Sequence, residues 1–219
     1  MARLRFVVLV LCVLGLAACA YASARLAGWV APSKLPPYPP WVLAHFVSAA
    51  AFVVIAPLQL WPGLRRRRPL VHRTLGRIGV AVGCVMALSG ITMAYASPGR
   101  PVTEQIFMTA FFTSYLAMLG LGVRAAVARD FAAHRAWMLR MTAVALTPVT
   151  QRAIFPVFAM TLGVGGLERF WQLFISAAWI AWAVNMIAVE AWLRAKPQAA
   201  SPPIKPPPIR KLHAEPQAS

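Results

Sequence analysis

The 219-residue sequence has few acidic residues and none of the motifs that mark soluble enzymes. It holds five aspartates and glutamates against 22 lysines and arginines, and only three cysteines. No serine, cysteine or aspartate is spaced with a histidine in a recognisable catalytic arrangement, and phosphate-loop and dinucleotide fingerprints are missing. The sequence therefore argues against hydrolytic or nucleophilic catalysis and against nucleotide binding. All three cysteines fall in apolar runs, where they suit small buried side chains better than disulfides.

Long apolar runs dominate what is present, since 60% of the residues are hydrophobic. A run crosses a hydrocarbon core of about 30 Å when it supplies ~20 helical residues. The runs here are continuously apolar, without the alternation of outer-membrane strands, and they predict helices. We expect an all-α, polytopic transmembrane helix bundle of the plasma membrane, with spans at about 6–28, 41–62, 75–96, 105–123, 138–163 and 170–192.

The predicted chain has three parts. Residues 1–30 form an N-terminal membrane anchor that resembles a signal sequence, because a basic start precedes an apolar core and small residues. Residues 31–195 form the transmembrane helical bundle. Residues 196–219 hold seven of the 19 prolines, so this segment is expected to be a disordered cytoplasmic tail.

Basic residues predict the orientation, because short loops rich in lysine and arginine stay in the cytoplasm. Seventeen of the 22 precede span one, follow span six, or lie between spans two and three or four and five. Four lie in the alternate loops, which predicts cytoplasmic N and C termini. The run Arg65 to Arg68 lies between two spans, so anionic lipids at the cytoplasmic loops are the expected partners, and nucleic acid is not.

Arg152 is a cation inside an apolar run, and no other span offers it a carboxylate at mid-membrane depth. Such residues usually face a bundle interior or a water-filled cavity. We expect Arg152, Gln151 and His45 to line a pocket in the outer half of the membrane for a haem propionate, a quinone or a lipid phosphate. The alternatives are an ion pair with Glu104 or Glu168 of the outer loops, and snorkelling without a ligand.

Two similar strings begin with histidine and arginine at the cytoplasmic ends of spans three and five. His72 and His134 would lie at one depth on neighbouring helices, where they are expected to ligate a haem iron or another metal. Arg73 and Arg135 would then neutralise haem propionates. The alternative is that all four side chains snorkel toward lipid phosphates.

Span three carries small residues on a single helical face, spaced by three or four positions. This spacing favours close helix packing, and a flat cofactor lying against the face is the alternative. The residues are Gly76, Gly79, Gly83, Ala87 and Gly90.

The polar positions together resemble a family of bacterial multi-pass membrane proteins called domain of unknown function 2306. The resemblance covers about residues 40–165 and implies that these are the family's motif positions, without implying an activity. The residues are His45, Pro57-Leu58-Gln59, His72-Arg73-x-x-Gly76-Arg77, His134-Arg135-x-Trp137-Met138-x-Arg140 and Gln151-Arg152.

The layout is also reminiscent of b-type cytochromes, in which histidines of neighbouring spans hold haem between helices. It departs from them because His45 has no histidine at its level, so that Met93 or Met160 would have to replace one. The leading hypothesis is an electron-transfer protein that binds haem b or a quinone. The alternatives are a non-catalytic assembly or lipid-interacting factor, and a small-solute transporter that uses the prolines of span five and Asn185 of span six.

Overall fold

A computed structural model of the chain describes residues 39–195, and within this range every regular element is a helix. Five predicted spans are confirmed as helices that are long and apolar enough to cross a membrane. The predicted anchor and the proline-rich tail lie outside the described residues. The helices are α2 (Pro40–Leu60), α3 (Pro62–Arg67), α4 (Pro69–Ala96), α5 (Val102–Val127), α6 (Phe131–Ala145), α7 (Thr147–Leu162) and α8 (Leu167–Ala195).

Several helices extend beyond the apolar runs that predicted them. Helix α4 begins at Pro69 and α6 at Phe131, six or seven residues before the predicted starts. Proline suits a first helical turn, and arginine forms helices well while its long side chain reaches toward polar surroundings. A hydropathy pattern records only the apolar part of such a helix, so it places the ends too far inside.

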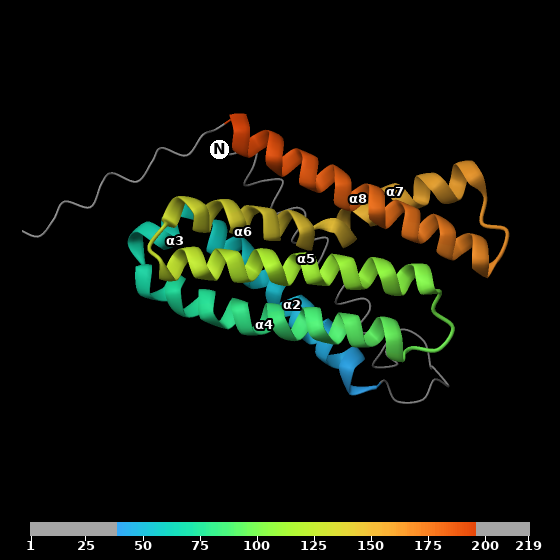
Figure 1. The fold of residues 1–219 in the computed structure, drawn as a ribbon, viewed down its shortest axis with the longest axis horizontal. Coiled ribbons are helices and arrows are strands. Elements are labelled where there is room, and N and C mark those ends of the chain that lie inside the picture. Colours follow the sequence, from blue (N-terminus) through green and yellow to red (C-terminus); the bar gives the residue numbers. More distant parts are fainter. Residues whose placement is uncertain (1–38, 196–219) are drawn as a thin grey trace, which may run out of the picture.

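The helices pack in a regular order, with α2 on α4, α4 on α5, α5 on α6, and both α6 and α7 on α8 (Figure 1). Arginines gather where α3 and α5 end and where α4 and α6 begin, and we call this the arginine end of the bundle. The opposite end, where α5 and α8 begin, contains Glu104 and is called the Glu104 end.

Glycines of α4 allow the rings of α5 to approach closely. A Cβ atom added at Gly83 would overlap the hydroxyl of Tyr115, and one added at Gly90 would overlap the ring of Phe112. Both rings are buried in the core shared by α2, α4 and α5. Glycine is needed here because a side chain on α4 would occupy the space that the rings fill.

The other end of the same glycine face packs against α2. A Cβ at Gly79 would lie 3.1 Å from Cγ2 of Ile55, and one at Gly76 would lie 3.5 Å from Oε1 of Gln59. Side chains of two helices therefore cover the face, which serves helix packing and is not open to a flat cofactor.

The fifth span is broken between α6 and α7. Pro148 lies in the first turn of α7 and has no N–H, so it cannot bond the carbonyl of Val144 one turn earlier. The break falls at Leu146, whereas Pro156 is accommodated inside α7.

A polar side chain of α8 secures the break. Asn185 donates from Nδ2 to the carbonyl of Ala143 at 3.2 Å, and its Oδ1 accepts from the hydroxyl of Thr150 at 3.0 Å. Backbone groups left open by a broken helix in a membrane need such partners.

Candidate functional site

His134 is held by a short turn between α5 and α6. Arg129 adopts a left-handed backbone with φ of 60°, and Asp130 caps α6 by accepting from the N–H of Ala133 at 2.9 Å. The imidazole then reaches α5, where its Nδ1 lies 2.8 Å from the carbonyl oxygen of Gly122. A carbonyl only accepts, so Nδ1 carries the hydrogen and Nε2 keeps its lone pair.

Gly122 lets α6 come close enough for that contact. A Cβ at this position would overlap the terminal methyl of Met138 and would lie 3.4 Å from Cβ of Trp137. The close approach brings the first turn of α6 within reach of the α5 backbone.

His72 lies at the same arginine end, in the first turns of α4. Its Nδ1 is buried and has no hydrogen-bond partner within residues 39–195. Both histidines therefore lie at the arginine end, on α4 and α6, and each of these helices packs against α5.

The side chain of Gln59 on α2 adds an unsatisfied polar atom next to His72. Its side chain lies over Gly76, one helical turn from His72 on the same face of α4. The Nε2 atom of Gln59 is buried and lacks a partner among the described residues. Buried amide nitrogens are rarely left unpaired, so this position can accept a hydrogen-bonding group.

The arginines that follow the two histidines are exposed at the bundle surface. Arg73 makes a long bond of 3.4 Å from Nε to the carbonyl of Pro69, and the guanidinium of Arg135 lies 5.7 Å from the ring centre of Trp192. Neither arginine takes part in the two ion pairs that join residues of the described range.

His45 makes a similar bond in another place. Its Nδ1 lies 2.9 Å from the carbonyl oxygen of Met86 on α4, and its ring packs edge-on against Phe112 at 5.8 Å. Gly90 leaves room for both rings, since a Cβ there would lie 3.1 Å from Cε1 of His45. Met86 meets His45 through its backbone carbonyl and not through its sulfur. Met160, one of the two methionines predicted as a possible ligand, is 78% exposed on α7.

Arg152 and Gln151 lie on a different side of the bundle from His45. Gln151 is buried and donates from Nε2 to the carbonyl of Phe174 on α8 at 3.0 Å. Arg152 is exposed and donates from Nη1 to the carbonyl of Pro148 in its own helix at 2.7 Å. Because α7 packs on α8 while His45 packs on α4 and α5, the structure does not assemble these three residues into one pocket.

Glu104, expected in an outer loop, belongs to the first turn of α5 and is 1% exposed. It forms an ion pair with Arg100, four residues earlier, and its second oxygen has no partner within the described range. Glu168 instead accepts from Nε2 of Gln172 at 3.3 Å. The spacing of Arg100 and Glu104 is the sequence signal that points to this pair.

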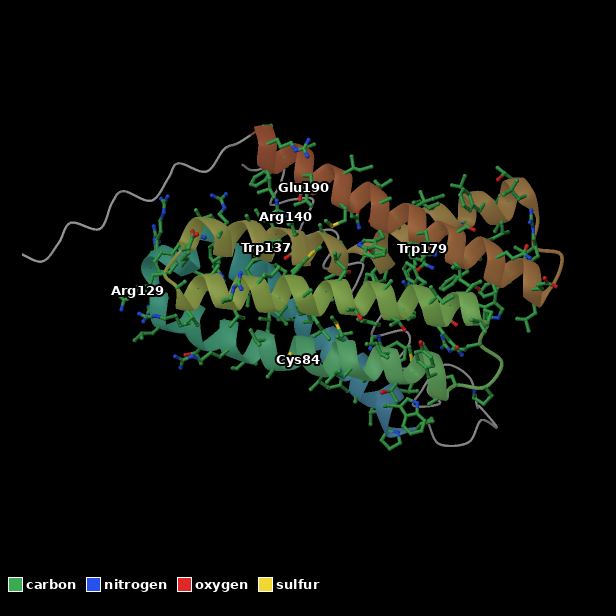
Figure 2. All side chains as sticks on the ribbon, in the orientation of Figure 1. Cys84, Arg129, Trp137, Arg140, Trp179 and Glu190 are labelled. Atoms are coloured by element: carbon green, nitrogen blue, oxygen red, sulfur yellow. The ribbon has the colours of Figure 1, made fainter. Side chains whose placement is uncertain are left out.

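A second ion pair was not anticipated from the sequence. Arg140 of α6 donates from Nε to Oε1 of Glu190 on α8 at 2.5 Å and from Nη2 to Oε2 at 3.1 Å, and Figure 2 shows the two side chains between their helices. The guanidinium also lies 4.9 Å from the ring centre of Trp137. Glu190 is the acidic residue within the predicted span 170–192. An acidic residue in a membrane span usually pairs with a basic one, and this is the signal that points to the pair.

The described residues contain no group of three or more histidines, cysteines, aspartates or glutamates placed to hold a metal ion. A haem iron needs fewer protein ligands, because the porphyrin supplies four and the protein one or two. His72 and His134 suffice in number as ligands of a haem iron, but they do not belong to a group of three that would hold a metal ion.

These observations define a polytopic helical membrane protein with polar sites at both ends of the bundle. Comparison with protein families matches residues 42–193 to the family described as "Predicted membrane protein (DUF2306)". The chain belongs to this family. No curated protein and no solved structure matches it.

Proposed function

We propose that this protein is a membrane electron-transfer protein that holds haem b at the arginine end, with His72 and His134 as the iron ligands. The observation that carries the proposal is the bond from His134 Nδ1 to the carbonyl of Gly122 at 2.8 Å. Histidines that bind metals usually donate their other ring N–H to a carbonyl or carboxylate, which fixes the ring and directs the lone pair at the metal. His72 lies at the same end of the bundle, in the first turns of α4, and its buried Nδ1 has no partner within residues 39–195.

The arginine end also suits the charge of the cofactor. Haem b carries two propionates and supplies one-electron redox chemistry when bound. Arg73 and Arg135 are exposed beside the histidines and are free of ion pairs with carboxylates of residues 39–195. Arginine pairs well with carboxylates, so these two residues would hold the propionates. His45 has the same type of hydrogen bond, but it contacts α4 at Met86 and Gly90, away from the arginines near the start of this helix, so the haem is assigned to the arginine end.

The visible absorption spectrum of the detergent-purified, full-length protein tests the proposal. We expect a Soret band and a reduced α band in the wild type, and loss of both in His72→Ala or His134→Ala. His213→Ala, a substitution in the tail, serves as the control and should keep the spectrum. A wild-type protein that elutes as a single folded species without these bands, even when expressed with added haem, contradicts the proposal.

The orientation is a related proposal, in which the arginine end faces the cytoplasm of a plasma membrane and contacts anionic lipids. The excess of arginine in the loops at this end supports it. A cysteine placed at position 129 of a cysteine-free variant should resist an impermeant thiol reagent in intact cells, whereas one at Gly99 should react. The reverse pattern would refute the orientation.

Small-solute transport is a second candidate, favoured by the break at Leu146. Broken helices with polar contacts at membrane depth are a recurring feature of transporter sites. Vesicles that contain the protein should then accumulate a solute from a panel of small anions and neutral metabolites, and Asn185→Leu should abolish the uptake. Equal uptake by empty vesicles would remove this candidate.

A further inference from the structure

The carboxylate of Glu104, at the Glu104 end, has an ion-pair partner for only one of its two oxygens. Glu104 is 1% exposed, one of its oxygens accepts from Nη1 of Arg100, and Oε2 is buried with no partner among the described residues. Arg100 neutralises the charge of the pair, so the remaining need is for a hydrogen-bond donor and not for a cation. A buried carboxylate oxygen without a donor is costly, and a bound water or ligand is the usual explanation.

A donor without an acceptor lies near the same guanidinium. The Nε1 atom of Trp171 on α8 is buried and unpartnered within residues 39–195. The carbon of the Arg100 guanidinium is 5.8 Å from the centre of the Trp171 ring. Arg100 therefore links an unused acceptor on α5 to an unused donor on α8.

Aromatic rings line the neighbouring turns of α5 and α8. Phe107, one turn along α5 from Glu104, meets Trp179 of α8 at 5.1 Å, and Figure 2 shows Trp179 on α8. Phe170 and Phe174 lie 5.4 Å and 5.9 Å from Trp171. The site combines a flat apolar wall with one acceptor and one donor, at the end of a membrane span.

We propose that the Glu104 end binds the hydroxylated ring of a quinol. Oε2 of Glu104 accepts from the quinol hydroxyl, and Nε1 of Trp171 donates to an oxygen of the ring. A hydroxyl is the group that offers both a donor and an acceptor without charge, and an aromatic ring fits the apolar wall. The inference deepens the proposed function by naming a substrate class, and it rests on that function for the role of the quinol in electron transfer, although binding alone can be measured without it.

Binding of decylubiquinol to the full-length protein in lipid nanodiscs tests the site, with saturable quenching of tryptophan fluorescence as the readout. Glu104→Gln and Trp171→Phe each remove one hydrogen bond and keep most of the side chain. We expect each to weaken binding about tenfold or more, since a bond to a charged or buried partner contributes at least that factor. Glu168→Gln and Trp61→Phe are the matched controls, on an exposed glutamate and on an exposed tryptophan between α2 and α3 whose Nε1 is not among the buried, unpartnered atoms.

The possible results separate this inference from the proposed function, because the Soret band is recorded on the same samples. Saturable binding that only Glu104→Gln and Trp171→Phe weaken supports the inference, whether or not haem is present. Absence of saturable binding, or equal affinity in all four variants, overturns it even if haem is bound, and leaves the two atoms to a structural water. If Glu104→Gln fails to fold, Trp171→Phe against Trp61→Phe decides the question.

Discussion

The two halves of the bundle are held together by different contacts. In the half formed by α2, α4 and α5, glycines of α4 receive rings of α5 and side chains of α2. In the half formed by α6, α7 and α8, Gln151 bonds the α8 backbone, Asn185 bonds the α6 backbone, and Arg140 pairs with Glu190. The first half combines glycine packing with the interhelical hydrogen bond from His45 to α4, whereas the second adds these three polar contacts to the packing of Phe155 on the rings of α8.

The difference shows which interactions hold helices together in a bilayer, where the hydrophobic effect does not drive their association. Lipid tails are as apolar as side chains, so helices in a bilayer associate through close packing and interhelical hydrogen bonds. Glycines supply the close packing in α4. The broken span cannot present such a continuous face, and its open backbone groups require interhelical hydrogen bonds. The proposed haem ligands, His72 on α4 and His134 on α6, come one from each half.

Substitution of Gly90 by alanine should have the largest effect on this comparison. The added Cβ would overlap the stiff ring of Phe112 and press on His45, which overpacks the first half. We expect a loss of about 1–3 kcal/mol in the free energy of unfolding. Unfolding by denaturing detergent, followed by circular dichroism, measures it.

Gly122→Ala is the matched control for that substitution. Its added Cβ would meet mainly the flexible end of Met138, which can move aside. The loss should therefore be smaller than for Gly90→Ala. Equal losses would show that ring packing on α4 has no special weight.

Removal of the polar contact at the broken span should have a moderate effect. Asn185→Leu keeps the approximate volume and deletes the bonds to Ala143 and Thr150. Interhelical hydrogen bonds in membrane proteins contribute ~0.6 kcal/mol each on average, so we expect a loss of about 1 kcal/mol. Unchanged stability, measured in the same unfolding assay, would mean that packing alone holds the second half.

The Arg140–Glu190 pair should contribute least. The two side chains are 23% and 33% exposed, so solvent and salt screen the interaction. Glu190→Gln should cost about 0.5 kcal/mol or less at low salt, and the difference from the wild type should vanish in high salt. A loss that persists at high salt would show that the pair is better shielded than its exposure indicates.

Much of the fold follows from the sequence, because long apolar runs suffice to place helices. The fifth span shows the limit. Its two prolines are visible in the sequence, but the structure is needed to show that the helix breaks before Pro148, where Asn185 of α8 bonds the backbone, and continues through Pro156. The stripe of glycines predicted a packed face on α4, whereas the rings that fill it belong to helices whose neighbours the sequence does not specify.

The site residues divide in the same way. The repeated histidine and arginine strings point to His72 and His134, and the structure places both at the arginine end, on α4 and on α6. The predicted grouping of Arg152 with His45 rests on their similar depth in the membrane, and depth does not specify which helices are neighbours. The partners of Arg140 and Glu104 depend on contacts across helices or on the exact start of a helix, which apolar runs do not define.

The amount of haem bound per polypeptide, measured in purified wild-type protein and in His134→Ala, tests the central claim most directly. The proposed function predicts about one haem b per chain in the wild type, through the ligands His72 and His134, and almost none in the variant at equal protein recovery. A folded wild type that binds no haem, or a His134→Ala variant that binds as much as the wild type, would contradict it.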